Sequence, residues 1–250
     1  MLASQRKKAI LELLAQDKQV LSSELSQKFM ISEDSIRRDL RELAAEGLLQ
    51  RVHGGALPAS AALAPIETRK NVQSRSKQTV AAKAVKLIQP GQVVMIDGGT
   101  TAHELVARIP QDIAFTVVTH SPGIAVSLVD HPLVEVIVIG GRLFKHSVVT
   151  VGSAMIDAIS HINADLFFMG VTGIHASAGF TTGDYEEACV KRALSQRAAE
   201  TVVMASAEKM NAASAFAIGP LSLASTIIID GEPDTVLREA CAKQQIELLR

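Results

Sequence analysis

Residues 31–56 read ISEDSIRRDLRELAAEGLLQRVHGGA, a pattern typical of a helix followed by a short hairpin. Ser32 is a favourable N-cap, and the acidic residues after it suit a first helical turn, where the helix dipole favours negative charge. Apolar residues then recur at the spacing of one helix face: Ile36, Leu40 and Leu43. Gly47 suits a left-handed cap, so we predict a helix that begins after Ser32 and ends near Gly47.

The opposite face of this predicted helix carries three arginines: Arg37, Arg38 and Arg41. On an isolated amphipathic helix such residues are usually only a solvated face. Here residues 48–53 predict a short strand, and Gly54 with Gly55 predicts a tight turn into a second strand. A helix with an arginine face that precedes a small basic hairpin is typical of a winged helix-turn-helix.

Two further helices are predicted before this one. Residues 22–29 form the nearer helix, with Ser22 as its expected N-cap, and only two residues separate it from Ser32. Helices joined so closely cross at a steep angle, which is the helix-turn-helix arrangement. Residues 4–16 supply the third helix. We expect contacts to bases and phosphates of double-stranded DNA from Ser22, Ser32, Ser35, Arg37, Arg38, Arg41, Arg51, His53 and Gly54.

Two motifs in this region carry a resemblance to a known family. Residues 35–40, SIRRDL, followed by residues 51–56, RVHGGA, resemble the signature of the DeoR family of bacterial transcriptional regulators. The family usually has Thr where this chain has Ser35, a difference that keeps the hydroxyl group. The resemblance implies a DNA-binding regulator, most often a repressor, that forms a homodimer or homotetramer.

Composition narrows the remaining classes. A chain of 250 residues has room for one small and one larger domain. With no Trp and one Tyr, it suits an aliphatic α/β body better than an aromatic-lined groove for single-stranded nucleic acid. Cys189 and Cys241 form no CxxC pair, so we expect no structural zinc, and we expect no other metal or cofactor. We see no leader-like start and no apolar run of membrane-spanning length, and we expect a cytoplasmic protein.

Charge divides the chain into two parts. Through Lys83 there are 14 Lys and Arg against 9 Asp and Glu, and the remainder has 11 against 17. A basic head on an acidic body fits a head that meets phosphate. Residues 58–65 are uncharged and Ala-rich, so we expect domains at 1–57 and 75–250 with a linker at 58–74. We interpret the basic residues at 67–83 as a solvated helix rather than a second phosphate-facing surface.

The larger domain shows apolar strands that alternate with helices. This pattern predicts an α/β fold, with a parallel sheet that helices cover on both faces. The expected strands are residues 93–96, 115–118, 134–139, 166–169, 202–205 and 226–229, and the expected helices are 103–108, 123–129 and 185–199. Because ligands of such sheets bind at the carboxyl ends of strands, the loops there are the candidate site.

The loop at residues 97–101, DGGTT, leads from a predicted strand into a helix. Its glycines allow close backbone approach, its threonines offer hydroxyl groups, and free amides at a helix start favour an anion. We interpret the loop as a cradle for a phosphate or sugar phosphate, with a plain strand-to-helix turn as the alternative. It lacks the Lys of a Walker loop and the dinucleotide fingerprint, so ATP and NAD are disfavoured.

Other strand ends carry further candidates. His120 is either a ligand contact or a loop histidine with a local hydrogen bond, and Arg142, beside two glycines, suits a phosphate or an interface. In contrast, Glu186, Glu187 and Lys191 lie at helical spacing and are interpreted as a salt-bridged face. The expected effector site comprises Asp97, Gly98, Gly99, Thr100, Thr101, His120, Gly141, Arg142 and Lys209.

The family resemblance extends to this body. The DeoR effector domain resembles ribose-5-phosphate isomerases in fold and recognises phosphorylated sugars. Those isomerases carry acidic residues in the loop that here reads Gly170-Val171-Thr172-Gly173, so binding without turnover is implied, since proton abstraction has no base there. The family often has Asn in place of His120 and Asp in place of Ser206, which suggests an atypical effector or response.

The sequence therefore favours a DNA-binding regulator of carbohydrate metabolism genes, controlled by a sugar phosphate. Two alternatives stay open at this point. One is a sugar-phosphate isomerase or lyase with a DNA-binding head. The other is a metabolite-binding module whose helix-turn-helix contacts protein.

Overall fold

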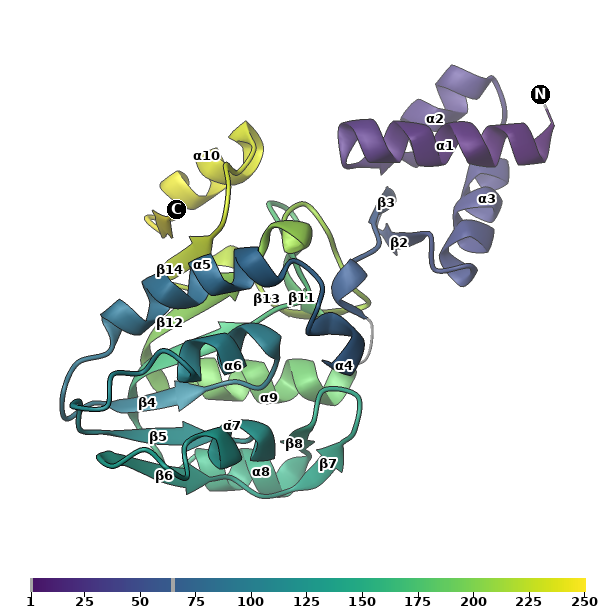
Figure 1. Cartoon of the computed structure of the whole chain (residues 1–250). Helices are drawn as coiled ribbons and strands as arrows, with labels where there is room; N and C mark the ends of the chain where they lie inside the picture. The colour runs from purple at the N-terminus through teal and green to yellow at the C-terminus, as the bar shows by residue number, and fades with distance from the viewer. Residues whose placement is uncertain (1, 64–65) are drawn as a thin grey trace.

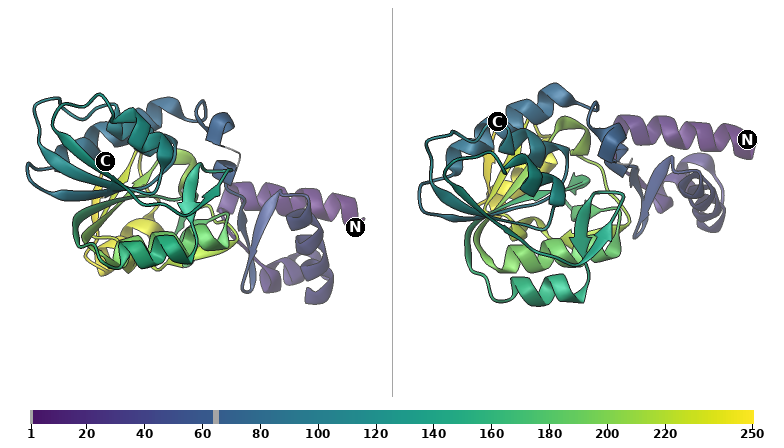
Figure 2. Two further views of the ribbon diagram at one scale, coloured as in Figure 1. Left: turned by 90° about the horizontal axis from the view of Figure 1, so that it is seen from below. Right: turned by 60° about the horizontal axis from the view of Figure 1, so that its bottom comes forward.

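The computed structural model describes residues 2–63 and 66–250, which form a small N-terminal head and a larger body. Figure 1 shows the head at one end of the molecule, joined to the body by the segment that contains the short helix α4 (Ile66–Arg69). Both views in Figure 2 agree that the head projects from the body rather than covering its sheet. The head is therefore free to present a surface of its own.

The head contains three helices and a small antiparallel sheet. The helices are α1 (Ala3–Asp17), α2 (Ser22–Phe29) and α3 (Glu33–Ala45), and the strands β1 (Val20–Leu21), β2 (Leu49–Val52) and β3 (Gly55–Pro58) pair in the order β1-β3-β2. One core joins them, which includes Ile10, Leu14, Leu25, Ile36, Leu40, Leu43 and Leu49. The predicted winged helix-turn-helix is confirmed.

The predicted ends of α3 are confirmed by its caps. The hydroxyl oxygen of Ser32 accepts a hydrogen bond from the Ser35 amide at 3.3 Å. At the other end Gly47 has a φ of +73°, and the amide of Leu48 turns back to donate to the Leu43 carbonyl at 3.0 Å. This left-handed cap satisfies carbonyl groups that the last helical turn leaves unpaired.

The predicted cap of α2 is wrong by one residue. Leu21 occupies the N-cap position, and Ser22 is the first helical residue. The amide of Ser22 instead donates to the Gly54 carbonyl at 2.8 Å, which ties the hairpin turn to the start of α2. Next to it, a Cβ atom on Gly55 would lie 1.9 Å from the Val20 carbonyl oxygen, so β1 can pair with β3 only because this residue is glycine.

A buried ion pair locks α1 onto α3. The Arg6 guanidinium donates to both carboxylate oxygens of Asp39, with Nε–Oδ2 at 2.5 Å and Nη2–Oδ1 at 3.1 Å. Asp39 is almost fully buried, and its hydrogen bond raises the pKa of Arg6. The acidic residue in the middle of the arginine motif is therefore structural.

The body is built on a seven-stranded sheet in which every strand is parallel to its neighbours. The order is β15-β14-β12-β9-β4-β5-β6. The strands are β4 (Val93–Ile96), β5 (Phe115–Thr119), β6 (Val134–Val138), β9 (Ala164–Gly170), β12 (Ala198–Ala205), β14 (Thr226–Ile229) and β15 (Glu247–Leu249). The six predicted strands and the parallel α/β class are confirmed, and β15 adds a seventh.

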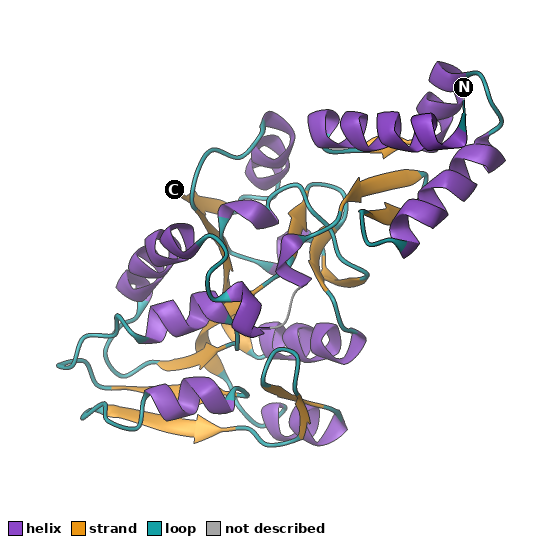
Figure 3. Ribbon diagram, turned by 45° about the vertical axis from the view of Figure 1, so that its right-hand side comes forward, coloured by secondary structure: helices purple, strands orange, loops and turns teal. Residues whose placement is uncertain are grey.

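Helices cover both faces of this sheet, as Figures 1 and 3 show. One face is packed by α5 (Ser74–Ala84), α6 (Thr100–Val106) and α7 (Pro122–Ser127), and the other by α8 (Ser153–Ile159), α9 (Tyr185–Gln196) and α10 (Thr235–Lys243). Alternate strand residues serve the two cores: Leu166 and Phe168 face α5–α7, whereas Phe167 and Met169 face α8–α10. In Figure 1 the carboxyl ends of β4, β5 and β6 point toward α4.

Two smaller sheets lie beyond these strand ends, and the sequence did not predict them. Strands β10 (Gly173–His175), β11 (Gly179–Thr182) and β13 (Phe216–Gly219) form an antiparallel sheet, and β7 (Arg142–Phe144) pairs with β8 (Val149–Val151). Their segments are only three or four residues long, which is too short for an alternation of apolar and polar residues to identify a strand. No helix within residues 2–63 and 66–250 combines the length and apolar character needed to span a bilayer.

Candidate functional site

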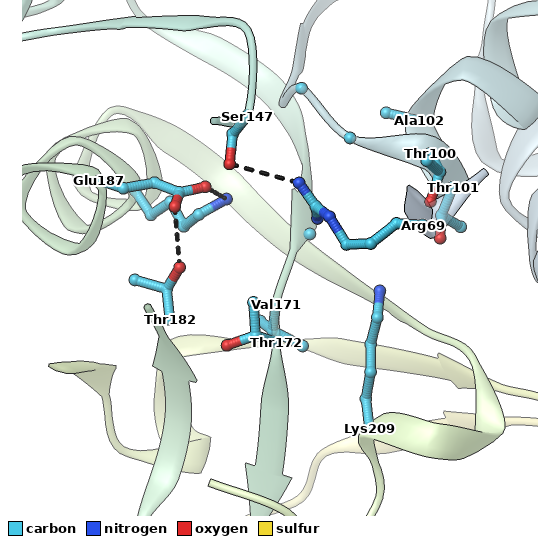
Figure 4. A pocket seen from close by; sticks show the side chains of 14 residues that line it. Arg69, Thr100, Thr101, Ala102, Ser147, Val171, Thr172, Thr182, Glu187 and Lys209 are labelled. Carbon is cyan, nitrogen blue, oxygen red and sulfur yellow. Dashed lines mark hydrogen bonds and ion pairs between the residues drawn. The ribbon is translucent and has the colours of Figure 1, made fainter. Parts of the chain in front are cut away.

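A pocket lies where the loops after β4 and β9 meet α4 and α9 (Figure 4). Five predicted effector residues line it: Gly98, Gly99, Thr100, Thr101 and Lys209. The other lining residues are Arg69, Ala102, Ser147, Gly170, Val171, Thr172, Thr182, Glu187 and Lys191. A neighbouring cavity of about 120 Å³ shares Arg69, Ser147, Thr172 and Glu187 and widens the site toward Phe144 and His146.

The loop after β4 takes its shape from glycine. A Cβ atom on Gly98 would lie 2.2 Å from a methyl carbon of Val149, so a larger residue would push the loop off the β7–β8 hairpin. Gly99 has a φ of +117° and occupies the N-cap position of α6. Thr100 and Thr101 follow at the start of that helix, and both are nearly buried.

Asp97 holds this loop from below rather than lining the pocket. One carboxylate oxygen, Oδ1, accepts from the Gly98 amide at 2.8 Å, and the other, Oδ2, accepts from the Gly170 amide at 2.8 Å and from the Lys191 ammonium group. Burial alone would raise the pKa of this carboxyl, but Lys191 and His120 outweigh it and hold the Asp97 pKa well below its ordinary value. Asp97 therefore connects the ends of β4 and β9 to α9.

His120 is also placed beneath the pocket. Its Nε2 lies 2.9 Å from Asp97 Oδ1, and its Nδ1 lies 2.9 Å from the Thr150 carbonyl oxygen. The ring is enclosed and is absent from the pocket lining that the described residues form. Of the two interpretations of this histidine, the structure shows the local hydrogen-bonding one.

The structure corrects the expected positions of Gly141 and Arg142. Neither lies in the pocket wall of the described structure. The β7–β8 hairpin carries Arg142 outward, where its largely exposed guanidinium pairs with Glu186. The same hairpin places Ser147 in the pocket instead.

Two cations in the pocket are not neutralised by acidic partners. Lys209 is nearly buried, and its ammonium group makes no hydrogen bond or ion pair with any described residue; in Figure 4 it extends toward Arg69. Burial lowers the pKa of Lys209 to about 8, and the charges of Arg69 and Lys77 act in the same direction against Glu208. Arg69 donates from Nη2 to the Ser147 hydroxyl at 3.3 Å.

Two further polar atoms at this pocket lack a partner. Within residues 2–63 and 66–250, Nε of Arg69 and Oγ1 of Thr101 are buried and make no hydrogen bond. Buried polar groups are nearly always satisfied, so unpaired ones in a pocket wall indicate where a ligand would supply the missing bond. Two unneutralised cations beside free donors are suited to an anionic, hydroxylated ligand.

The opposite wall is formed by residues that the sequence assigned to a salt-bridged surface. Glu187 and Lys191 on α9 do pair, at 3.4 Å, but both are buried at the pocket. Glu187 also accepts from the Thr182 hydroxyl at 3.0 Å, as Figure 4 shows. The local sequence does not reveal that these two residues are buried, because their burial depends on Asp97, which lies 94 residues before Lys191.

The solvated helix expected at residues 67–83 is also corrected. Lys77 on α5 is only 2% exposed, and its ammonium group donates to the main-chain carbonyl of Arg69. Arg69 itself enters the pocket. The sequence does show a cluster of basic residues after the linker, but its pattern did not reveal which of these side chains point inward.

A second surface lies on the head. The guanidinium-bearing residues of α3, Arg37, Arg38 and Arg41, are exposed. A groove of about 240 Å³ runs between α3 and the β2–β3 hairpin, and its walls include Ser22, Arg37, Arg51, His53 and Gly54. The Ser32 and Ser35 hydroxyl groups lie 3.1 Å apart at the start of α3. The structure thus brings five of the nine predicted contact residues together in this groove, and the other four lie on α3 or at its start.

The three arginines differ in their surroundings. Arg37 pairs with Glu33 at 2.7 Å and approaches Asp34 at 3.4 Å. Arg38 and Arg41 form no ion pair with the part of the chain that the structure describes. They are therefore the more available cations of this face.

Comparison with known proteins gives matches over both parts of the chain. Residues 6–61 match the model of the DeoR-like helix-turn-helix domain, and residues 72–231 match that of the DeoR C terminal sensor domain. The HTH-type transcriptional regulator GlpR of Haloferax volcanii is 34% identical, over 96% of this chain and 94% of its own. The glycerol-3-phosphate regulon repressor of Escherichia coli is 29% identical, over 98% of each chain.

Among solved structures, ribose 5-phosphate isomerase A of Methanocaldococcus jannaschii aligns with 55% of each chain, at 15% identity and a TM-score of 0.42.

Proposed function

This chain belongs to the DeoR family of transcriptional regulators, and we propose that it is a sequence-specific DNA-binding repressor of carbohydrate metabolism genes that a phosphorylated metabolite controls. The observation that carries the proposal is the coexistence of two sites in one chain. An exposed arginine helix with a wing lies on the head, and a pocket with unneutralised cations lies at the strand ends of the body. Because the proposed partner is chromosomal DNA, we propose that the protein is located in the cytoplasm.

Three features of the head support DNA as its partner. Arg37, Arg38 and Arg41 are exposed on α3, and the hairpin adjoins this helix at a groove whose walls include Arg37, Arg51 and His53. Arginine forms bidentate hydrogen bonds with guanine and with phosphate, so these side chains suit both base and backbone contacts in a major groove. A head that served only protein contact would have no need of this positive surface.

The pocket supports an anionic effector. Lys209 would supply a charge without having to break an existing ion pair, and the Thr101 hydroxyl would gain its missing hydrogen bond. We place the phosphate against Gly98, Gly99, Thr100, Thr101 and Lys209, with Asp97 and His120 as supports of the loop. Relatives named as repressors of a glycerol-3-phosphate regulon and of the aga operon support small phosphorylated carbohydrates as the effector class.

We propose binding without turnover. The loop Gly170–Gly173 supplies no carboxylate to the pocket. Of the two carboxylates in the described walls, Glu187 is engaged by Lys191 and Thr182, and Asp184, in the neighbouring cavity, accepts from the Glu187 amide. A general base must be free to accept a proton from the substrate. An isomerase is the second candidate, because Glu187 and Lys191 do face the pocket.

We also propose that the protein acts as a homodimer or homotetramer. A single winged head contacts one half-site, and symmetric operators are read by two heads related by a two-fold axis. The acidic, apolar body is the proposed interface.

One experiment tests the proposed function as a whole. The purified protein is incubated with DNA from upstream of its own gene in a mobility-shift assay, and a panel of sugar phosphates is titrated in. We expect a specific complex that one or a few of the compounds dissociate. A protein that does not bind this DNA, or that converts a sugar phosphate into product, would contradict the proposal, and the second result would favour the isomerase.

A further inference from the structure

The segment between the head and the body, residues 58–70, is bound to the body along its described length and is here called the connector. The Pro58 carbonyl accepts from the Ala213 amide at 3.3 Å, and Ala59 forms a parallel bridge with Ala213. Farther along, the Ile66 amide donates to the His146 carbonyl at 3.1 Å. Part of the segment predicted to be a linker is thus docked on the body, where it contacts the loops around the pocket.

Ser60 makes the most direct of these contacts. Its buried hydroxyl group donates to the Thr172 carbonyl and accepts from the Ala62 amide at 3.0 Å. Thr172 lines the pocket, and its own hydroxyl lies 2.7 Å from that of Ser214, the neighbour of Ala213. The pocket loop therefore bonds directly to the connector at Ser60, and it also bonds through Ser214 to the segment that pairs with Pro58 and Ala59.

Arg69 completes the link, because the connector places this side chain inside the pocket. It comes from the last residue of α4, and its guanidinium reaches the Ser147 hydroxyl (Figure 4). The ammonium group of Lys77 donates to the main-chain carbonyl of Arg69, which holds the backbone in place where the Arg69 side chain begins. A purely structural arginine would use its donors within the protein, whereas Nε of Arg69 is buried without a partner among the described residues.

We propose that the effector site is shared between body and connector, with Arg69 binding the anionic group of the ligand and thereby holding the connector in its docked position. This inference rests on the proposed function, because it assumes an anionic ligand in this pocket. Ligand binding and connector docking then stabilise each other, since a ligand that contacts Arg69 binds the docked form better. The connector leads directly from β3 of the wing, so its position determines how the head is held.

Hydrogen–deuterium exchange of the full-length protein tests this coupling, with inorganic phosphate as the probe. In the wild type we expect phosphate to slow exchange both in the loop at residues 98–102 and in the connector. In Arg69→Ala we expect phosphate to bind about tenfold or more weakly, since a hydrogen bond to a charged group is lost. At a phosphate concentration that saturates this variant, the loop should still be protected while the connector is not. Arg238→Ala, which removes a surface arginine on α10 that pairs with Glu232, is the control and should behave as the wild type.

A second variant lies outside the pocket. Ser60 is not part of the wall, so Ser60→Ala should leave phosphate affinity unchanged unless connector docking and binding are coupled. We expect a several-fold loss of affinity and a weaker effect of phosphate on operator binding. Ser195→Ala is the matched control, because it also removes a buried hydroxyl group, one that bonds to Thr201 at 2.8 Å away from the pocket.

The outcomes separate the two proposals. Protection of the loop without protection of the wild-type connector, or equal phosphate affinity of Ser60→Ala and Ser195→Ala, would overturn the shared site and leave the effector pocket standing. Absence of any protection by phosphate in the wild type would overturn the pocket itself, and the shared site with it.

Discussion

The carboxylate of Asp97 and the ammonium group of Lys191 form an ion pair that is closed off from solvent, with side-chain exposures of 0% and 3%. The pair joins the end of β4 to the middle of α9, across 94 residues of sequence. It lies directly beneath the loop that we assign to the phosphate. The pocket thus depends on a charge pair in which Lys191 lines the wall and Asp97 lies beneath it.

We expect Asp97→Asn to lower the free energy of unfolding by about 3 kcal/mol. Removal of one partner of a buried pair typically costs roughly 3–5 kcal/mol, and the lower end applies because Glu187 stays 3.4 Å from Lys191. Urea denaturation followed by circular dichroism measures the change. Glu232→Gln, which breaks an exposed pair with Arg250, is the control and should stay within about 0.5 kcal/mol of the wild type. Equal stability of the two variants would contradict the structural role of Asp97.

Effector affinity should fall as the pH rises above 8. Burial lowers the pKa of Lys209 to about 8, and a bound phosphate would raise it again because the anion favours the ammonium form. Below pH 8 the group is already protonated, so it adds no pH dependence. Above pH 8 binding must take up a proton, and affinity should fall by up to about tenfold per pH unit. Calorimetry at pH 7, 8 and 9 measures this.

Lys209→Arg is the matched variant for that measurement. Arginine stays protonated throughout this range, so the decline above pH 8 should disappear. A decline of the same size in Lys209→Arg would assign it to another group.

Thr101→Val should weaken binding of the effector without lowering the stability of the fold. The substitution keeps the shape of the side chain and removes a hydroxyl group that is buried and unpaired in the described structure. We therefore expect no loss of thermal stability, but a loss of about 0.5–1.5 kcal/mol in sugar-phosphate binding, the usual size of one hydrogen bond. Calorimetry and thermal unfolding measure the two quantities. Unchanged affinity would move the ligand away from this loop.

On the head, Arg38→Ala and Arg41→Ala should each weaken operator binding by roughly 1–3 kcal/mol if they contact bases. Arg37→Ala should cost less, because Arg37 must first give up its pairing with Glu33. Fluorescence anisotropy with labelled operator DNA measures the affinities. If a folded variant that lacks all three arginines binds the operator as tightly as the wild type, α3 is not the recognition helix.

Light scattering at micromolar concentration should show a dimer or a larger assembly. We expect the interface to include the edge of the sheet at β6, where the apolar residues Ile137 and Val138 are exposed. Val138→Lys should shift the assembly toward a monomer. Val236→Lys, at an exposed position on α10, is the control and should not. A wild-type monomer, with or without DNA, would contradict the oligomeric proposal.

The sequence predicted those parts of the fold that depend on interactions between residues close together in the chain. The cap at Ser32, the apolar spacing of α3 and the glycine at its end are contained within 16 residues, and the structure has them as predicted. The strands of the parallel sheet are continuous apolar runs and were also found. Residues 98–101 of the predicted loop line a pocket, whereas their role in holding a phosphate stays a prediction.

The remaining pocket residues could not be predicted in this way. Whether Lys191 is exposed or buried depends on a carboxylate that only the sheet topology brings near it. Arg69 was hidden for a similar reason. The connector before it is uncharged apart from Glu67 and has the composition of a solvated linker, yet it docks through main-chain bonds that leave no mark on the sequence. Arg142 was misplaced because a two-stranded hairpin, invisible in the pattern, turns it outward.

The docked connector also determines where the chain can be divided in order to fuse it to part of another regulator. A hybrid regulator would join the DNA-binding head of one protein to the sensor domain of another, with the join in the stretch between them. In this chain that stretch is docked on the sensor domain, because Pro58 and Ile66 bond to it and Arg69 lines the pocket that we propose as the ligand site. We expect a fusion that keeps the native chain from residue 58 to retain ligand binding. A join nearer α5 would remove Arg69 and with it part of the pocket wall.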